Sequence, residues 1–167
     1  MYTHKMTDEI LPRTDFPGMD NFLRGVRPNG YIEQPWGIAQ SCDETLPEEN
    51  NELLRHEVDK GSTIYHIILD SASRAGIDAR QAEKVGDTGT SVTTVDDMHT
   101  LLKGLDLRKF PLYVYAGANV LPMLSLVAAA RRAAGEDMTK VQGIVGADPI
   151  GVLVTDGKLP ASLDAYY

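Results

Sequence analysis

The feature that most constrains the fold of this chain is a pair of almost uninterrupted apolar runs. STIYHIIL begins at Ser62 and FPLYVY begins at Phe110, and both are rich in β-branched and aromatic residues. Runs of this kind are typical of strands that are buried on both faces, as in a parallel sheet. Two further strands are predicted, one in YIEQPWGIAQSC at residues 31–42 and one, together with its loop, in VQGIVGADPIGV at residues 141–152.

Helical patterns separate these strands. In residues 45–61, Thr45 and Glu48 have the spacing of a capping box, and Gly61 marks the end of the helix. Residues 96–105 predict a short helix, with Asp96 or Asp97 near its cap. The strongest helix is predicted over residues 119–136, with Pro122 in its first turn, where proline is tolerated. Residues 155–167 resemble the approach to another helix.

Alternating strands and helices predict an α/β fold with a parallel sheet, either doubly wound or a (β/α)8 barrel. Prolines and glycines interrupt residues 1–30, so we expect an extended N-terminal arm anchored by Phe16, Phe22 and Leu23. Removing 30 of the 167 residues leaves 137, whereas a complete barrel takes about 250. Residues 31–167 therefore fit a partial (TIM) barrel of about four β/α units.

The charge of the chain excludes some partners. Its formal net charge is −8, and its Lys and Arg residues do not cluster, so we expect no nucleic-acid partner. The longest apolar stretch, residues 121–130, is too short to span a bilayer. The first ten residues are polar and unlike a signal peptide, and Cys42 is a lone cysteine. These features predict a cytoplasmic protein with no membrane partner.

Several short motifs occur in order along the chain. They are Phe16-Pro17-Gly18, Phe22-Leu23-Arg24-Gly25, Tyr31 with Pro35-Trp36, Val85-Gly86 with Gly89 and Asp97-Met98, and Asn119 to Leu126. This ordered set resembles the adenosylcobalamin-dependent acyl-CoA mutases, of which methylmalonyl-CoA mutase is the type member. The resemblance implies that residues 31–167 are the N-terminal half of a (β/α)8 barrel. It also implies that the pantetheine arm of an acyl-CoA threads along the axis of that barrel.

The chain departs from this family where active members contact the substrate. Active members carry an arginine before the Pro-Trp pair, where this chain has Gln34. After the tryptophan they have a threonine, then an arginine and then a tyrosine at alternate positions, where this chain has Gly37, Ala39 and Ser41. A later glutamine corresponds to Gly146. The resemblance therefore implies substrate-channel positions without the polar side chains that carry the reaction. The channel candidates are Tyr31, Gln34, Gln40, Ser41 and Gly146.

Other motifs resemble the small subunit of heterodimeric mutases, whose barrel has lost its active site. They are GADPIG at residues 146–151 and the following LPASLDAYY. The family's cobalt-ligating signature, aspartate-any-histidine-any-any-glycine, does not occur in this chain. We therefore expect a non-catalytic chain that binds no cofactor itself, with adenosylcobalamin in the parent complex. A catalytic large mutase subunit or a second copy of the chain is the expected partner, and acyl-CoA is a possible ligand.

Two alternatives to this hypothesis remain open. In the first alternative, the chain is an acyl-CoA-binding barrel fragment of an active mutase with altered substrate contacts. In the second, it is an unrelated doubly wound binding domain. The missing arginine, threonine and tyrosine argue against the first alternative. The FPG and RG motifs of the arm argue against the second.

Structural roles are expected for most of the other reactive side chains. Asp70 and Asp148 end apolar runs where barrel enzymes place catalytic groups, but helix caps are the simpler interpretation. Cys42 is expected to be a small buried hydrophobe. The Arg131-Arg132 pair is assigned to the solvated face of its helix. The four histidines lack metal-ligand spacing, and His66 alone is expected to face a barrel interior.

Overall fold

The computed structural model describes residues 17–18, 22, 25–159, 162 and 164. The chain divides into two compact units, Met1–Gly37 and Ile38–Tyr167. In the first unit the described residues form no α-helix, and a single 3-10 turn, η1, covers Gly30–Ile32. Most of the predicted arm lies outside the described residues, and its boundary after residue 30 stays a prediction.

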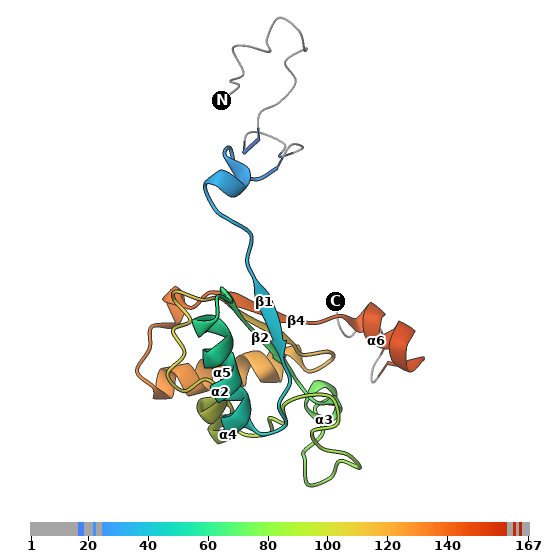
Figure 1. The fold of residues 1–167 in the computed structure, drawn as a ribbon. Coiled ribbons are helices and arrows are strands. Elements are labelled where there is room, and N and C mark those ends of the chain that lie inside the picture. The colour runs from blue at the N-terminus through green and yellow to red at the C-terminus, as the bar shows by residue number, and fades with distance from the viewer. Residues whose placement is uncertain (1–16, 19–21, 23–24, 160–161, 163, 165–167) are drawn as a thin grey trace, which may run out of the picture. The chain divides into compact units, whose positions relative to one another are not determined.

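The second unit is built on four parallel strands. They are β1 (Ala39–Cys42), β2 (Ile64–Ile68), β3 (Leu112–Tyr115) and β4 (Gly143–Gly146), in the spatial order β1-β2-β3-β4 (Figure 1). Each strand pairs in parallel with the next strand along the chain. This arrangement confirms the predicted fold class, an α/β fold of the partial-barrel type.

The helices of this unit follow the strands. They are α2 (Pro47–Asp59), α3 (Ser71–Ala75), α4 (Val95–Leu101), α5 (Val120–Ala133) and α6 (Pro149–Asp156), and a 3-10 turn, η2 (Met138–Lys140), precedes β4. Helices α2, α4 and α5 pack together on one face of the sheet. The fully buried core lies between that face and the helices, and its largest side chains are Leu54, Ile67, Leu69, Met98, Leu101, Leu102, Leu105 and Leu107.

Burial of β2 alternates along the strand, which corrects one prediction. Tyr65 and Ile67 are buried, whereas Ile64, His66 and Ile68 are only partly buried. The prediction that this strand is buried on both faces was therefore wrong. The physical reason is that helices cover one side of the sheet only, so alternate side chains point away from the core.

The ends of α2 and α4 differ from the prediction. Helix α2 begins at Pro47 after Leu46, and no side chain caps it. The hydroxyl of Thr45 instead donates to the carbonyl of Gly86 at 3.2 Å, so the predicted capping box was wrong. A capping box does occur in α4, between Thr94 and Asp97, which agrees with the expectation of an aspartate near that cap.

Helix α6 was not predicted at its observed place. It begins at Pro149, inside the segment assigned to the fourth strand and its loop, and ends before Gly157, whose φ is +70°. The apolar residues of the segment suit a strand or a buried helix equally well, and periodicity alone does not separate the two. Thr155 and Asp156 are the last two residues of this helix, whereas the sequence predicted the approach to another helix there.

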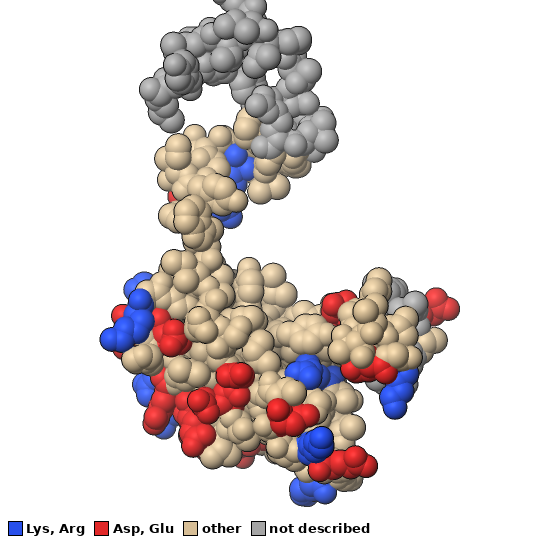
Figure 2. All heavy atoms as spheres, turned by 45° about the vertical axis from the view of Figure 1, so that its right-hand side comes forward, with Lys and Arg blue, Asp and Glu red and all other residues tan. Residues whose placement is uncertain are grey.

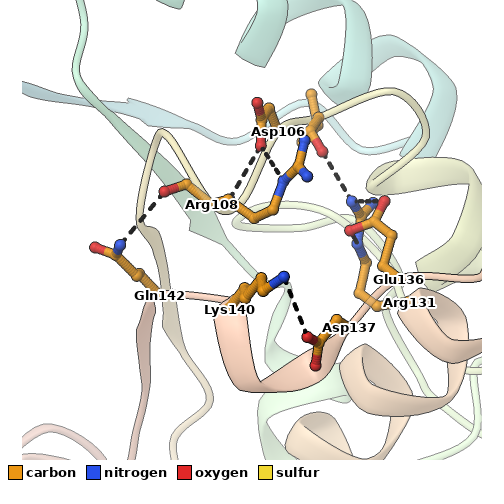
Figure 3. Close-up of polar contacts among 8 residues, drawn as sticks. Asp106, Arg108, Arg131, Glu136, Asp137, Lys140 and Gln142 are labelled. Atoms are coloured by element: carbon orange, nitrogen blue, oxygen red, sulfur yellow. Dashed lines mark hydrogen bonds and ion pairs between the residues drawn. The ribbon is translucent and has the colours of Figure 1, made fainter.

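Arg131 is not on the solvated face of α5, and that prediction was wrong. Its side chain is 3% exposed. The guanidinium donates to the carbonyl oxygens of Leu102 at 2.7 Å and Leu105 at 2.9 Å, and it pairs with Glu136. Figure 3 shows this group beside a more exposed set of ion pairs. The buried arginine ties α5 to the chain that follows α4, whereas Arg132 is exposed as predicted.

Candidate functional site

The sheet face opposite α2, α4 and α5 is here named the open face. No helix among the described residues of the second unit covers it. Because side chains alternate along a strand, the register places one set of side chains on this face. The set is Ala39, Ser41, Ile64, His66, Ile68, Tyr113, Tyr115, Ile144 and Gly146. In a closed barrel this face would be the interior.

A polar pair interrupts the otherwise apolar open face. Ser41 on β1 lies in register with His66 on β2, and Ser41 Oγ is 3.2 Å from His66 Nδ1. Tyr113 continues the same row on β3 and is 37% exposed. No carboxylate among the described residues bonds to His66, so the pair lacks the third group that orients a catalytic base. The row can hydrogen-bond a ligand, and its geometry favours that role over nucleophilic catalysis.

The structure brings together only part of the predicted channel. Ser41 and Gly146 both lie on the open face. Gln40 alternates to the opposite side, in register with the buried Tyr65, so it is not brought together with Ser41. Tyr31 and Gln34 belong to the first unit, and their role in a channel stays a prediction.

Within the first unit, Tyr31 and Trp36 form an aromatic pair. Their ring centroids are 5.7 Å apart with an interplanar angle of 79°, an edge-to-face arrangement. The two side chains are 72% and 69% exposed. Together with Gln34 they help to line a hollow of about 680 Å³. Large aromatic side chains this exposed are typical of a contact surface.

Asp70 and Asp148 act as helix caps and not as an acid/base pair. The fully buried carboxylate of Asp70 accepts from the backbone N–H groups of Ser73 and Gly86, both at 2.8 Å. Asp148 accepts from the N–H of Gly151 at 2.7 Å. Both carboxylates are held by backbone donors, which confirms the simpler interpretation of the sequence.

A hollow of about 610 Å³ lies at the carboxyl end of the sheet, where barrel enzymes place their chemistry. Arg74 and Lys158 contribute positive charge to its lining, and Asp156 contributes negative charge. Beside the hollow, burial raises the pKa of Tyr115, and the Asp148 carboxylate raises it further while Arg74 opposes them. The mixture of charges selects no single ligand.

The Ser71 side chain on the wall of this hollow is already engaged. Its hydroxyl donates to Asp87 at 2.5 Å, and its backbone N–H donates to the same carboxylate at 3.1 Å. These bonds lower the pKa of Asp87 to about 2. Ser71 therefore organises the loop that contains Asp87, and its hydroxyl is not free to attack a substrate.

The described residues contain no cluster of side chains that could by itself ligate a metal ion. No group of three or more His, Cys, Asp and Glu side chains in that part of the chain could hold a metal ion. Burial, with help from Glu57 and Asp43, raises the pKa of the Cys42 thiol to about 11. A thiol with that pKa is a poor nucleophile and a poor metal ligand at neutral pH.

The surface charge agrees with the sequence. On the face that Figure 2 displays, acidic side chains form a larger group than basic ones. Glu44, Glu49 and Glu52 line a shallow depression on and beside α2. Surfaces of this sign do not attract a phosphate backbone. Within the described residues, no helix has the length and apolar character needed to cross a membrane.

Comparison with known proteins decides the family. The family model described as methylmalonyl-CoA mutase matches residues 1–167. The chain belongs to the methylmalonyl-CoA mutase family. It is 28% identical over 151 residues to the methylmalonyl-CoA mutase of Escherichia coli, which covers 89% of this chain and 21% of that protein.

Two large subunits show the same degree of similarity. The methylmalonyl-CoA mutase large subunit of Streptomyces virginiae is 29% identical over 136 residues, covering 80% of this chain and 19% of the relative. The methylmalonyl-CoA mutase large subunit of Porphyromonas gingivalis is 29% identical over 155 residues, covering 86% of this chain and 22% of the relative. The chain thus spans about a fifth of the length of these methylmalonyl-CoA mutases.

Proposed function

We propose that this chain is a non-catalytic, structural part of an adenosylcobalamin-dependent methylmalonyl-CoA mutase, similar to the small subunit of the heterodimeric enzymes. One observation carries the proposal. Ala39, Ser41 and Gly146 all lie on the open face. These are the positions at which the family resemblance places an arginine, a tyrosine and a glutamine in active members. Three substrate contacts are thus absent from the one face that would line the channel.

The replacements cannot supply the missing chemistry. Ala39 carries no charge for a carboxylate or phosphate, and Gly146 has no side chain at all. The Ser41 hydroxyl is much shorter than a tyrosine phenol and already contacts His66. Positioning and electrostatic stabilisation of a reacting group both require side chains that reach it. In this proposal the open face is a channel wall without its reactive groups.

The proposal extends to partners and compartment. A catalytic large mutase subunit would bind this chain and would supply the adenosylcobalamin site. The exposed Tyr31 and Trp36 side chains offer apolar contact area for such a partner. The lone, free thiol of Cys42 suits a reducing cytoplasm.

A second candidate function rests on the row of Ser41, His66 and Tyr113. These side chains provide hydrogen-bonding groups on an apolar wall, the combination that small-molecule sites use. In this alternative the chain is an acyl-CoA-binding fragment of an active mutase with altered substrate contacts.

Turnover and binding measurements distinguish the two functions. The purified chain is incubated with adenosylcobalamin and methylmalonyl-CoA, and formation of succinyl-CoA is followed by chromatography. We expect no product, and measurable turnover would refute the non-catalytic role. Calorimetric titration with methylmalonyl-CoA, with the Ser41→Ala variant as control, tests the alternative. Binding that weakens in this variant would favour a substrate-binding fragment.

Association with a large subunit tests the structural role directly. The chain is mixed with a purified methylmalonyl-CoA mutase large subunit and analysed by gel filtration with light scattering. A stable complex supports the proposal. If the large subunit and this chain elute independently at micromolar concentration, the proposed partnership is wrong.

A further inference from the structure

A short segment before α4 is held on the sheet by hydrogen bonds. Its six residues, GDTGTS at positions 86–91, are here named the strap, and all of them are glycine or polar. Val85 before the strap is 46% exposed, and Val92 after it is buried. Burial of apolar area is the main force that holds a loop on a core, and the strap has little to bury. Segments with few buried apolar contacts are the ones that open while the rest of a domain stays folded.

The start of the strap is anchored at two residues. The N–H of Gly86 donates to the buried carboxylate of Asp70 at 2.8 Å. The carbonyl of Gly86 accepts from the Thr45 hydroxyl at 3.2 Å. The carboxylate of Asp87 accepts from the hydroxyl of Ser71 at 2.5 Å and from its N–H at 3.1 Å. These bonds join the strap to the segments that follow β1 and β2.

The end of the strap is bonded to the same end of the sheet. Thr90 forms an isolated parallel bridge to the residue that follows β2, and its N–H donates to the carbonyl of Ile68 at 2.9 Å. The Thr90 side chain is fully buried, and its hydroxyl donates to the carbonyl of Glu44 at 2.7 Å. The N–H of Ser91 donates to the carbonyl of Thr45 at 3.0 Å. Both ends of the strap therefore contact the carboxyl ends of β1 and β2.

A buried amide in contact with the strap has an unsatisfied acceptor. Asn50 of α2 is fully buried, and its Nδ2 donates to the Thr90 hydroxyl at 2.6 Å and to the carbonyl of Cys42 at 3.3 Å. No donor among the described residues reaches its Oδ1. A buried acceptor without a donor is unfavourable, and an opening that admits water relieves the cost. The closed strap is therefore bonded to a polar network that is not fully satisfied.

Gly89 allows the strap to approach the end of β2 closely. A Cβ atom at this position would overlap the carbonyl oxygen of Ile68, a backbone atom that cannot swing aside as a side chain can. The φ of Gly89 is not in the left-handed region, so its own backbone conformation does not exclude alanine. Glycine is needed here for close approach alone. A residue with a side chain would keep the strap from closing and would leave the core unchanged.

We propose that the strap is a gate that opens and closes as one unit at the carboxyl ends of β1 and β2. When it is closed, its own groups bond to the carboxylate of Asp70 and the amide of Asn50. When it is open, this carboxylate and this amide face solvent at the end of the sheet where α/β proteins bind ligands. All of these contacts lie within residues 42–92, so the gate does not depend on the proposed non-catalytic role.

Hydrogen exchange of single amides, followed by NMR on the unmodified chain, tests the gate. The amides of Gly86, Thr90 and Ser91 should share one degree of protection, because a unit opens as a whole. They should exchange roughly a hundredfold faster than the sheet amides of Tyr65 and Leu112. Low urea concentrations should leave the protection of the strap unchanged, because a local opening exposes little surface. Equal protection of strap and sheet, or unrelated protection of the three strap amides, would overturn the proposal.

The variant Gly89→Ala should hold the strap open. We expect the Thr90 and Ser91 amides to exchange about tenfold faster or more, while the sheet amides keep their protection. Thr88→Ala is the matched control, because Thr88 is an exposed residue of the strap whose hydroxyl bonds to the neighbouring Asp87, and it should exchange like the unmodified chain. Strap amides that stay protected in Gly89→Ala, or sheet amides that lose protection together with them, would contradict a separate gate. None of these outcomes bears on turnover, so the gate and the proposed function can fail separately.

Discussion

Replacement of Arg131 by methionine should be among the most destabilising single changes in the described part of this protein. Methionine fills a similar volume but donates no hydrogen bond. The carbonyl oxygens of Leu102 and Leu105 would lose the donors that lie at 2.7 and 2.9 Å. The side chain is 3% exposed, so little water can replace it.

The magnitude follows from the groups left without partners. Each buried carbonyl that loses its donor costs about 1–3 kcal/mol, and breaking a buried ion pair costs about 3–5 kcal/mol. The Glu136 side chain is 34% exposed and can be solvated again in the variant. The cost of breaking its ion pair with Arg131 therefore lies at the low end of that range. We expect a loss of about 3–5 kcal/mol. A domain of this kind is stable by only about 5–15 kcal/mol.

Urea unfolding followed by circular dichroism measures this loss. The adjacent Arg132→Met is the matched control, because Arg132 is exposed on the same helix and should change stability by less than about 0.5 kcal/mol. The reasoning would be refuted if both variants lost the same stability, or if Arg131→Met lost less than about 1 kcal/mol.

Three further predictions concern single groups. Cys42, with a pKa raised to about 11, should react with a thiol reagent at pH 8 only after unfolding; rapid labelling of the folded chain would contradict its burial. The carboxylate of Asp87 should titrate near pH 2 by carbon NMR, and Ser71→Ala should move this pKa back toward the ordinary range of an aspartate. Because the folded pKa is depressed, stability from this group is present above the unfolded pKa and is lost between about pH 4 and pH 2. An unchanged titration would show that Ser71 is not the cause. Asp70→Ala removes a fully buried cap with two N–H donors and should cost about 2 kcal/mol, against about 1 kcal/mol for the exposed cap Asp148→Ala; equal losses on urea unfolding would contradict the burial argument.

Some of this fold was predictable because local chemistry and tertiary packing agree. The run that contains β2 has a strand's composition in any environment, and Pro122 is tolerated only in the first turn of α5. The prediction failed where distant residues decide the outcome. Thr45 caps no helix because Gly86 lies within reach. Arg131 is buried because two carbonyls that precede β3 need donors.

The candidate site, like the fold, was predictable only in part. The family resemblance named Ser41 and Gly146 as channel candidates, and the register places both on the open face. The contact between Ser41 and His66 could not be predicted, because it depends on the stagger of two strands that are separated in sequence by 25 positions. Nor could the opposite orientation of Gln40, since a shift of one residue reverses every side chain of a strand.

The sequential strand order has a consequence for how the protein is made. Each strand pairs with the strand that was synthesised immediately before it. A growing chain can therefore add one β/α unit at a time, and no early strand has to wait for a late one. Each strand pairing closes the loop of a single β/α unit, so the paired strands are as close in sequence as a parallel sheet with helical connections allows. We would expect β1 and β2 to be paired while the ribosome is still producing β4.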